Sequence, residues 1–226
     1  MAGHFATVEA LRRRPDSVIE IRHDGGLTEA RFEVLARWAK EAGVPLVEDA
    51  GRVRQVRSKA NVHVVAWLRR PEVALQEDAT HVLLAGVADP GNVGAIVRSC
   101  AAFGVTDVAV VGGHDPWSPH ALRASLGATF GLRVVTYSAW ELYDASFPHR
   151  PWLAFDASGR HAVHDLTWPE GPCTLVFGSE WPGLNAELKA RSTTVRIEQT
   201  AAVESLNVAV AAGIVLHAYA TRKDHR

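Results

Sequence analysis

The sequence has little of what metal sites and disulfide-stabilised folds need. It contains two cysteines, Cys100 and Cys173, far apart in a chain of 226 residues. No Cys-x-x-Cys pair and no His-Glu-x-x-His run occurs, so the ligand spacings of zinc sites are absent and we expect no metal site. Two isolated cysteines also cannot build a disulfide framework. We expect both to be buried thiols in a reducing compartment.

Long apolar runs are scarce as well. The longest, residues 208–216, is too short to span a bilayer. The first residues lack the apolar centre of a signal peptide. The sequence therefore predicts a cytoplasmic protein without a membrane segment. Its composition, 47% hydrophobic and 22% charged, is typical of a globular chain that can bury a core.

Neither sign of charge dominates the chain. The 24 basic and 25 acidic residues give a net charge of −1, which argues against binding a polyanion over the whole surface. More than half of the lysines and arginines nevertheless fall within residues 1–70. Each of them alone is most simply a solvated surface residue. Together they make the N-terminal segment the expected RNA-docking surface.

Residues 1–67 read as a small α/β unit, and residues 68–78, charged and with a proline, read as a linker. Residues 79–226 alternate strands with helices, which indicates a mostly parallel sheet covered on both faces. In the first unit we expect helices at 8–13 and 28–42 and strands at 17–22, 45–48 and 61–67. In the second we expect strands at 81–86, 107–111, 133–137, 152–155, 173–177 and 194–197, and helices at 93–103 and 206–221.

A first polar group lies where strand 81–86 leads into helix 93–103. Asn92 is expected to cap this helix, and Gly94 in its first turn suggests close approach of a partner. Arg98 follows beside the apolar stripe of the helix and could equally pair with a carboxylate. A helix start after a strand also suits anion binding. The glycine patterns of dinucleotide-binding and P-loop proteins are absent, which argues against a Rossmann-type oxidoreductase.

A second group follows the apolar strand 173–177. Gly178 would let the backbone approach a ligand closely at the carboxyl end of a strand, where open α/β sheets bind ligands. Glu180 is either a surface carboxylate or a functional group. The plainer alternative for this segment is a polar turn with Asn185 capping a helix.

A third group, Ser205-Leu206-Asn207, precedes the last helix. Either Ser205 or Asn207 could serve as its N-cap. The helix is apolar nearly all round, so most of its sides must be buried. Burial against a second subunit and burial in the chain's own core both remain open.

Taken together, the three groups resemble a known family. The patterns Asn92-x-Gly94-x-x-x-Arg98, Gly178-Ser179-Glu180-x-x-Gly183-Leu184 and Ser205-Leu206-Asn207-Val208 are similar to the three ordered motifs of the SpoU/TrmH branch of the SPOUT RNA methyltransferases. The resemblance covers roughly residues 80–222. More weakly, residues 1–67 resemble the L30e-like RNA-binding domain that precedes the catalytic domain in many members that modify rRNA.

The resemblance implies an α/β fold with a C-terminal deep trefoil knot, and a homodimer formed through the C-terminal helix. It implies an S-adenosylmethionine site at Gly178, Ile197 and Leu206, with Ser179, Glu198 and Gln199 beside them. It also implies methylation of a ribose 2′-hydroxyl of RNA, with rRNA favoured over tRNA because of the N-terminal domain. Arg98 would then be the essential residue, and Asn92, Glu180, Ser205 and Asn207 would position it, the donor and the ribose.

The chain departs from the family at one place. Many relatives have Ile-Pro-Met where this chain has Ile197-Glu198-Gln199. The difference leaves open a relative of the same fold that binds RNA without catalysis. A tRNA 2′-O-methyltransferase is a second alternative to an rRNA enzyme, because the sequence does not identify the target nucleotide.

Overall fold

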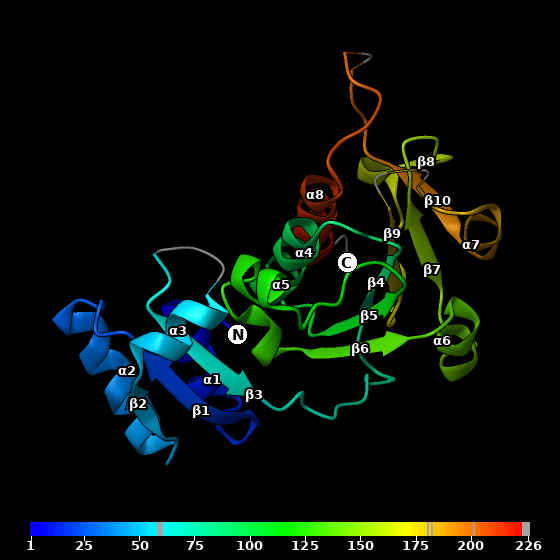
Figure 1. Cartoon of the computed structure of the whole chain (residues 1–226). Helices are drawn as coiled ribbons and strands as arrows, with labels where there is room; N and C mark the ends of the chain where they lie inside the picture. Colours follow the sequence, from blue (N-terminus) through cyan, green and yellow to red (C-terminus); the bar gives the residue numbers. More distant parts are fainter. Residues whose placement is uncertain (58–60, 180, 182, 201, 223–226) are drawn as a thin grey trace.

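The computed structural model describes residues 1–57, 61–179, 181, 183–200 and 202–222. Figure 1 shows a small N-terminal unit beside a larger unit built on one long sheet. The larger sheet has seven strands in the order β6-β5-β4-β9-β7-β10-β8. Every strand pair in it is parallel, which confirms the predicted sheet. The strands are β4 (His81–Ala85), β5 (Asp107–Val111), β6 (Arg133–Tyr137), β7 (Trp152–Phe155), β8 (His161–Ala162), β9 (Thr174–Gly178) and β10 (Thr193–Arg196).

Helices cover both faces of this sheet, as the alternation predicted. In Figure 1, α4 (Pro90–Ala102), α5 (Pro119–Ala124) and α8 (Val208–Thr221) lie on one side, and α6 (Trp140–Ser146) and α7 (Ala186–Arg191) on the other. Strand β4 displays the two layers: Val82 and Leu84 pack in the cluster with α4 and α8, whereas Leu83 packs with α6 and α7. All five residues of β4 are buried, as a central parallel strand requires.

Helix α4 begins earlier than predicted. Pro90 is its first residue and Asp89 is its N-cap, with the Asp89 carboxylate accepting a hydrogen bond from the Asn92 N–H at 2.8 Å. Asn92 therefore lies inside the first turn and does not cap the helix. The physical reason is that aspartate is as good a cap as asparagine, and proline at the next position has the φ that a helix start needs.

Gly94 makes the close approach that was expected, but to another helix. A Cβ at Gly94 would lie 2.5 Å from the Cβ of Ala124 and 2.6 Å from the carbonyl oxygen of Ala121. Helices α4 and α5 therefore pack backbone to backbone at this point. The glycine is required by the fold itself.

The small unit contains α1 (His4–Arg13), β1 (Val18–His23), α2 (Glu29–Glu41), β2 (Leu46–Glu48), α3 (Ala50–Val56) and β3 (Val64–Leu68). Its strands form the sheet β2-β1-β3, with β2 parallel and β3 antiparallel to β1. The core of this unit continues into the larger one, because Leu122 and Phe130 pack in the same cluster as α1 and β1.

The end of the predicted linker is fixed to the larger unit. The Gln76 N–H donates to the Asp107 carboxylate at 2.9 Å, and Arg150 donates to the Glu77 carbonyl at 2.6 Å. Both cysteines are buried free thiols, as expected. None of the described helices combines the length and the apolar character needed to cross a bilayer.

Candidate functional site

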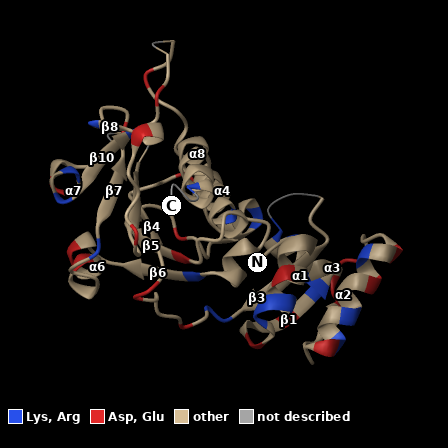
Figure 2. Cartoon of the chain, turned by 180° about the vertical axis from the view of Figure 1, so that it is seen from behind, with Lys and Arg blue, Asp and Glu red and all other residues tan. Residues whose placement is uncertain are grey.

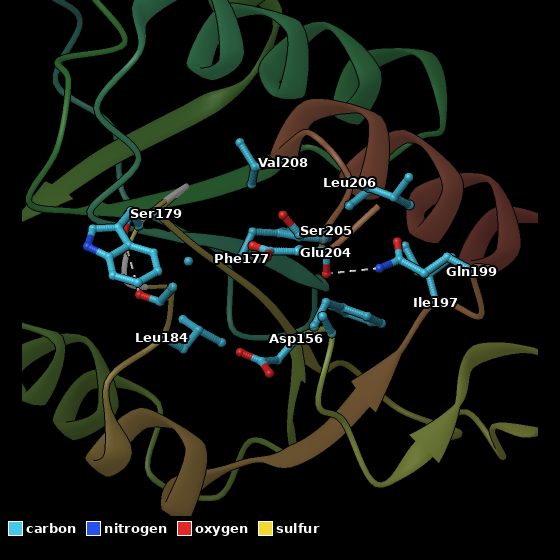
Figure 3. Close-up of a pocket in the computed structure, with 16 residues that line it drawn as sticks. Asp156, Phe177, Ser179, Leu184, Ile197, Gln199, Glu204, Ser205, Leu206 and Val208 are labelled. Atoms are coloured by element: carbon cyan, nitrogen blue, oxygen red, sulfur yellow. Dashed lines mark hydrogen bonds between the residues drawn. The ribbon is translucent and has the colours of Figure 1, made fainter. Parts of the chain in front are cut away.

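A cavity of about 310 Å³ opens at the carboxyl ends of β7, β9 and β10, where α8 begins (Figure 3). Its volume lies in the range of small-molecule sites. Four chain segments far apart in sequence supply its walls. They lie at the end of β7 (155–157), at the end of β9 and in the described part of the turn after it (177–179, 181, 183 and 184), after β10 (197 and 199), and at the start of α8 (204–206, 208 and 211).

Most of the predicted donor-binding residues line this cavity. Gly178 and Ser179 come from the β9 turn, Ile197 from the end of β10, and Leu206 from the segment before α8. Gln199 and the predicted positioning residue Ser205 line it too. The second and third sequence groups are therefore neighbours in space.

One of the predicted donor-binding residues, Glu198, does not line this cavity. Glu198 instead lines a shallow hollow beside Arg196 and Thr200, and its carboxylate lies 3.4 Å from His164 Nδ1. It points away from the main cavity because side chains alternate along the extended segment after β10. Glu180, the other predicted carboxylate, lies outside the described residues.

Gly178 is needed by the turn that follows it. A Cβ there would lie 2.7 Å from the amide nitrogen of Leu184 and 2.8 Å from the carbonyl carbon of Gly183. The chain folds back over the end of β9, and the Ser179 hydroxyl donates to the Gly183 carbonyl at 3.3 Å to close this turn. The glycine therefore makes room for the chain's own backbone, in addition to lining the cavity.

The floor of the cavity is aromatic. The rings of Phe155 and Phe177 stack with centroids 5.1 Å apart and planes 16° from parallel. Leu184, Val208 and Ala211 add aliphatic surface. Such walls suit a flat heteroaromatic ring.

The charges in the cavity are negative. Asp156 and Glu204 line it, and no lysine or arginine does so among the described lining residues. Burial by itself would raise the pKa of the Asp156 carboxyl, but hydrogen bonds from Lys189 and Ser158 outweigh burial and hold that pKa below its usual range. Asp156 is therefore ionised at neutral pH.

A side-chain bridge shapes the segment that departs from the family. The Gln199 amide donates to the backbone carbonyl of Glu204 at 3.1 Å, and both residues line the cavity (Figure 3). This bond links two points of the segment between β10 and α8. Gln199, which stands in the place of the family's methionine, thus takes part in the rim of the cavity.

The N-termini of α4 and α8 meet through two of the predicted residues. Asn207 caps α8, and its side-chain oxygen accepts from the N–H groups of Ala209 and Val210 at 2.9 and 3.2 Å. Its amide nitrogen donates to the side-chain oxygen of Asn92 at 3.0 Å. Two asparagines separated by 115 residues therefore hold the helix starts together.

Arg98 lies apart from this arrangement. It is exposed on α4 and does not line the cavity, and its side chain forms no hydrogen bond or ion pair with another residue of the described chain. Within one chain the structure does not bring Arg98 to the predicted donor site.

Sequence reasoning missed several lining residues, including Asp156, Glu204 and Trp181. Asp156 directly follows the predicted strand 152–155, and that position at the carboxyl end of a strand was the available signal. Trp181 lies at the mouth with 89% of its surface exposed. No group of three or more His, Cys, Asp or Glu side chains in the described ranges is arranged to hold a metal ion.

Comparisons with known proteins agree with this architecture. A 23S rRNA (adenosine(1067)-2′-O)-methyltransferase of Streptomyces laurentii is 38% identical over 146 residues, which are 62% of this chain and 54% of that protein. A 23S rRNA (uridine(2479)-2′-O)-methyltransferase of Streptomyces viridochromogenes is 29% identical over 205 residues, 81% of this chain and 71% of that protein. The chain thus spans about half the length of the first of these relatives.

Solved structures share the fold over nearly the whole chain. The SpoU methyltransferase AviRb of Streptomyces viridochromogenes, in complex with the cofactor AdoMet, matches with a TM-score of 0.83 at 24% identity and covers 98% of this chain and 89% of that chain. An RNA 2′-O ribose methyltransferase matches with a TM-score of 0.79 at 27% identity, covering 98% and 87%. The sequence profile of the SpoU rRNA Methylase family matches residues 79–217, more than half of the chain. The chain belongs to the SpoU rRNA Methylase family.

Proposed function

We propose that this protein transfers a methyl group from S-adenosylmethionine to a ribose 2′-hydroxyl of RNA, with rRNA favoured over tRNA. The observation that carries the proposal is the convergence of the second and third motif groups, together with Ile197 and Gln199, on one cavity. The names of the curated relatives support rRNA as the substrate. We further propose that the protein works in the cytoplasm.

The cavity fits this donor in its shape and in its charge. The stacked rings of Phe155 and Phe177 offer an apolar wall for an adenine, and Gly178, Ile197 and Leu206 would hold the donor. The Glu204 carboxylate suits a ligand whose sulfonium and ammonium are positive, whereas a phosphate would be repelled. When bound, S-adenosylmethionine supplies a methyl group activated by its sulfonium.

The protein's own residues must align the ribose and manage its proton. The 2′-hydroxyl is a poor nucleophile until its proton is drawn off. A guanidinium group offers several N–H donors and no acceptor, so Arg98 suits binding an RNA phosphate and stabilising a forming alkoxide better than accepting a proton. Asn92 and Asn207, joined by their hydrogen bond, would position the helix starts around the ribose.

We propose that a homodimer completes the site. Helix α8 leaves an apolar stripe in solvent, with Val210 52% and Ile214 40% exposed. Arg98 is exposed on the neighbouring helix α4 and stands outside its own cavity. A second copy packed on α8 would cover the stripe and bring its Arg98 toward this cavity.

We propose the deep trefoil knot on the basis of strand order. Strand β10 lies between β7 and β8, although β7 and β8 follow each other directly in sequence. The connection 156–160 therefore crosses β10, and Arg196 of β10 donates to the Gly159 and Arg160 carbonyls at 3.1 and 2.9 Å. This arrangement is the one expected where the chain end passes through an earlier loop.

The N-terminal unit, residues 1–67, is the proposed L30e-like RNA-binding domain, joined by the linker 68–78 to the catalytic domain 79–226. Part of its basic surface is paired internally, since Arg12 and Arg13 both bind Glu9 at 2.7 Å. Figure 2 shows Lys and Arg spread among acidic residues over this unit. Helix α2 carries Arg31, Arg37 and Lys40 exposed and without an ion pair to a described residue, so it is the face we assign to RNA.

Calorimetry with S-adenosylmethionine and methyl transfer to purified rRNA and tRNA test the proposal. We expect donor binding, and transfer to rRNA that falls at least ~100-fold in Arg98→Ala while donor binding stays unchanged. Arg160→Ala removes an exposed arginine that does not line the cavity and serves as the control. Donor binding without transfer to any RNA would favour a non-catalytic relative, and transfer to tRNA alone would correct the substrate.

A further inference from the structure

Asp156 is the first residue beyond β7 and belongs to none of the three motif groups. Its side chain lines the cavity and is only 15% exposed (Figure 3). A carboxylate held at this depth needs partners for its charge. The contacts around it indicate what it offers to a ligand.

One oxygen of the carboxylate is fully occupied. Oδ1 accepts from the N–H of Ser158 at 2.9 Å and from its hydroxyl at 2.5 Å. Oδ2 binds the Lys189 ammonium at 2.8 Å. Because each carboxylate oxygen has about two acceptor sites, Oδ2 keeps one of them. Oδ2 faces Gly183 in the turn after β9: a Cβ added to this glycine would lie 3.7 Å from Oδ2.

Lys189 also decides which kind of interaction Asp156 can make. The ammonium lies in contact with the carboxylate, so the two charges largely cancel at longer range. What remains for a ligand is a short-range, charge-assisted acceptor at Oδ2. This suits a hydroxyl group better than a distant positive charge.

We propose that Asp156 accepts a hydrogen bond from a ribose hydroxyl of the bound methyl donor and is a positioning residue of the donor site. The inference rests on the proposed function. A carboxylate just past a parallel strand is a common partner for a nucleoside sugar in α/β sheets. Phe155, the preceding residue, stacks on Phe177 in the wall assigned to the base, so base and sugar partners are adjacent in the chain. Ser158 and Lys189 hold the carboxylate in place for this contact.

The test pairs a change in the protein with a change in the ligand. Calorimetry measures the binding of S-adenosylmethionine, of S-adenosylhomocysteine, and of the 2′-deoxy and 3′-deoxy forms of S-adenosylhomocysteine to the parent protein and to Asp156→Asn. We expect Asp156→Asn to weaken S-adenosylhomocysteine about 10- to 100-fold, and to have little further effect on the deoxy form that lacks the contacted hydroxyl. Asp16→Asn, an exposed aspartate of the other unit, is the matched control.

Each other outcome has a defined meaning. If Asp156→Asn weakens the binding of both deoxy forms as much as it weakens the binding of S-adenosylhomocysteine, then Asp156 does not contact the sugar. A loss confined to S-adenosylmethionine would mean that Asp156 responds to the sulfonium, which also overturns the inference. Both results leave the methyltransferase proposal standing. If the parent protein binds neither S-adenosylmethionine nor S-adenosylhomocysteine, the proposed function itself fails.

Discussion

At the scale of single residues, Leu126 occupies a backbone conformation that usually selects glycine. Its φ is +51°, the only positive value at a non-glycine residue in the described chain. The Leu126 N–H donates to the Arg123 carbonyl and the Gly127 N–H to the Leu122 carbonyl, which together close the end of α5. A branched side chain in this conformation costs about 1 to 2 kcal/mol.

Leu126→Gly should therefore leave the free energy of unfolding unchanged or raise it by about 0.5 kcal/mol, since relief of strain offsets the added chain entropy. Urea denaturation measures the change. Leu142, 54% exposed within α6, is the matched control, and Leu142→Gly should lose about 1 kcal/mol. Equal losses at the two positions would show that Leu126 is not strained.

His81 is a buried residue with a consequence for pH. Its Nε2 donates to the Gln76 carbonyl at 2.7 Å, and Nδ1 lies 2.9 Å from the Tyr143 hydroxyl. Burial lowers its pKa from 6.5 to about 4. As the pH falls, the unfolded chain therefore takes up a proton at His81 before the folded chain does. The contribution of neutral His81 to the free energy of unfolding is complete above the pKa of the unfolded chain and is lost as the pH falls toward the pKa of the folded chain.

Between pH 6.5 and pH 4, protonation of His81 should lower the free energy of unfolding by up to about 3 kcal/mol. Urea midpoints measured at intervals from pH 7 to pH 4.5 test this expectation. His81→Gln should be less stable at pH 7 but lose less stability on acidification. A variant that follows the same steep decline as the parent would assign the pH dependence to other groups.

At the scale of elements, the sequence predicted long helices and buried strands well and short helices poorly. Helix α8 and all the strands of the large sheet except β8 were expected, because their apolar periods extend over many residues. Helices α5, α6 and α7 have only six or seven residues, too few to display a period. Local caps such as Ser118 and Asn185 start two of them, and only Asn185 was considered in advance.

The contact between α4 and α5 gives a prediction at this scale. Gly94→Ala should destabilise the protein by about 2 kcal/mol or more, because the new methyl group overlaps the backbone of α5. Gly51→Ala in α3 is the matched control, since its nearest neighbour is 3.4 Å away, and it should change stability by less than about 1 kcal/mol. Thermal or urea unfolding compares the two. A mild effect at Gly94 would contradict the close packing.

At the scale of the whole molecule, the candidate site depends on an order of strands that no local pattern encodes. The motif segments lie together because β9, β7 and β10 are neighbours in the sheet. The resemblance implied that Gly178, Ile197 and Leu206 converge, and composition or periodicity did not. Asp156 went unpredicted because its place after the predicted strand 152–155 was the one sign of it, and it belongs to none of the motif groups. The position of Arg98 outside the cavity depends on the packing of α4 and could not be read from its spacing to Asn92.

The proposed dimer is tested at the same scale. Ile214→Glu places a charge in the apolar stripe of α8 and should convert a dimer into monomers, as measured by sedimentation velocity. Leu142→Glu introduces the same charge on α6, on the other face of the sheet, and should leave the assembly intact. A parent protein that sediments as a monomer would contradict the proposal.

The place of β10 between β7 and β8 also sets an order of assembly. Two of the four walls of the cavity come from the chain after β10, and a third lies at the end of β7, with which β10 pairs. The cavity is therefore incomplete while residues 193–211 are still free, even when the strands before them have already paired. Ligand binding becomes possible only once β10 has taken its place in the sheet.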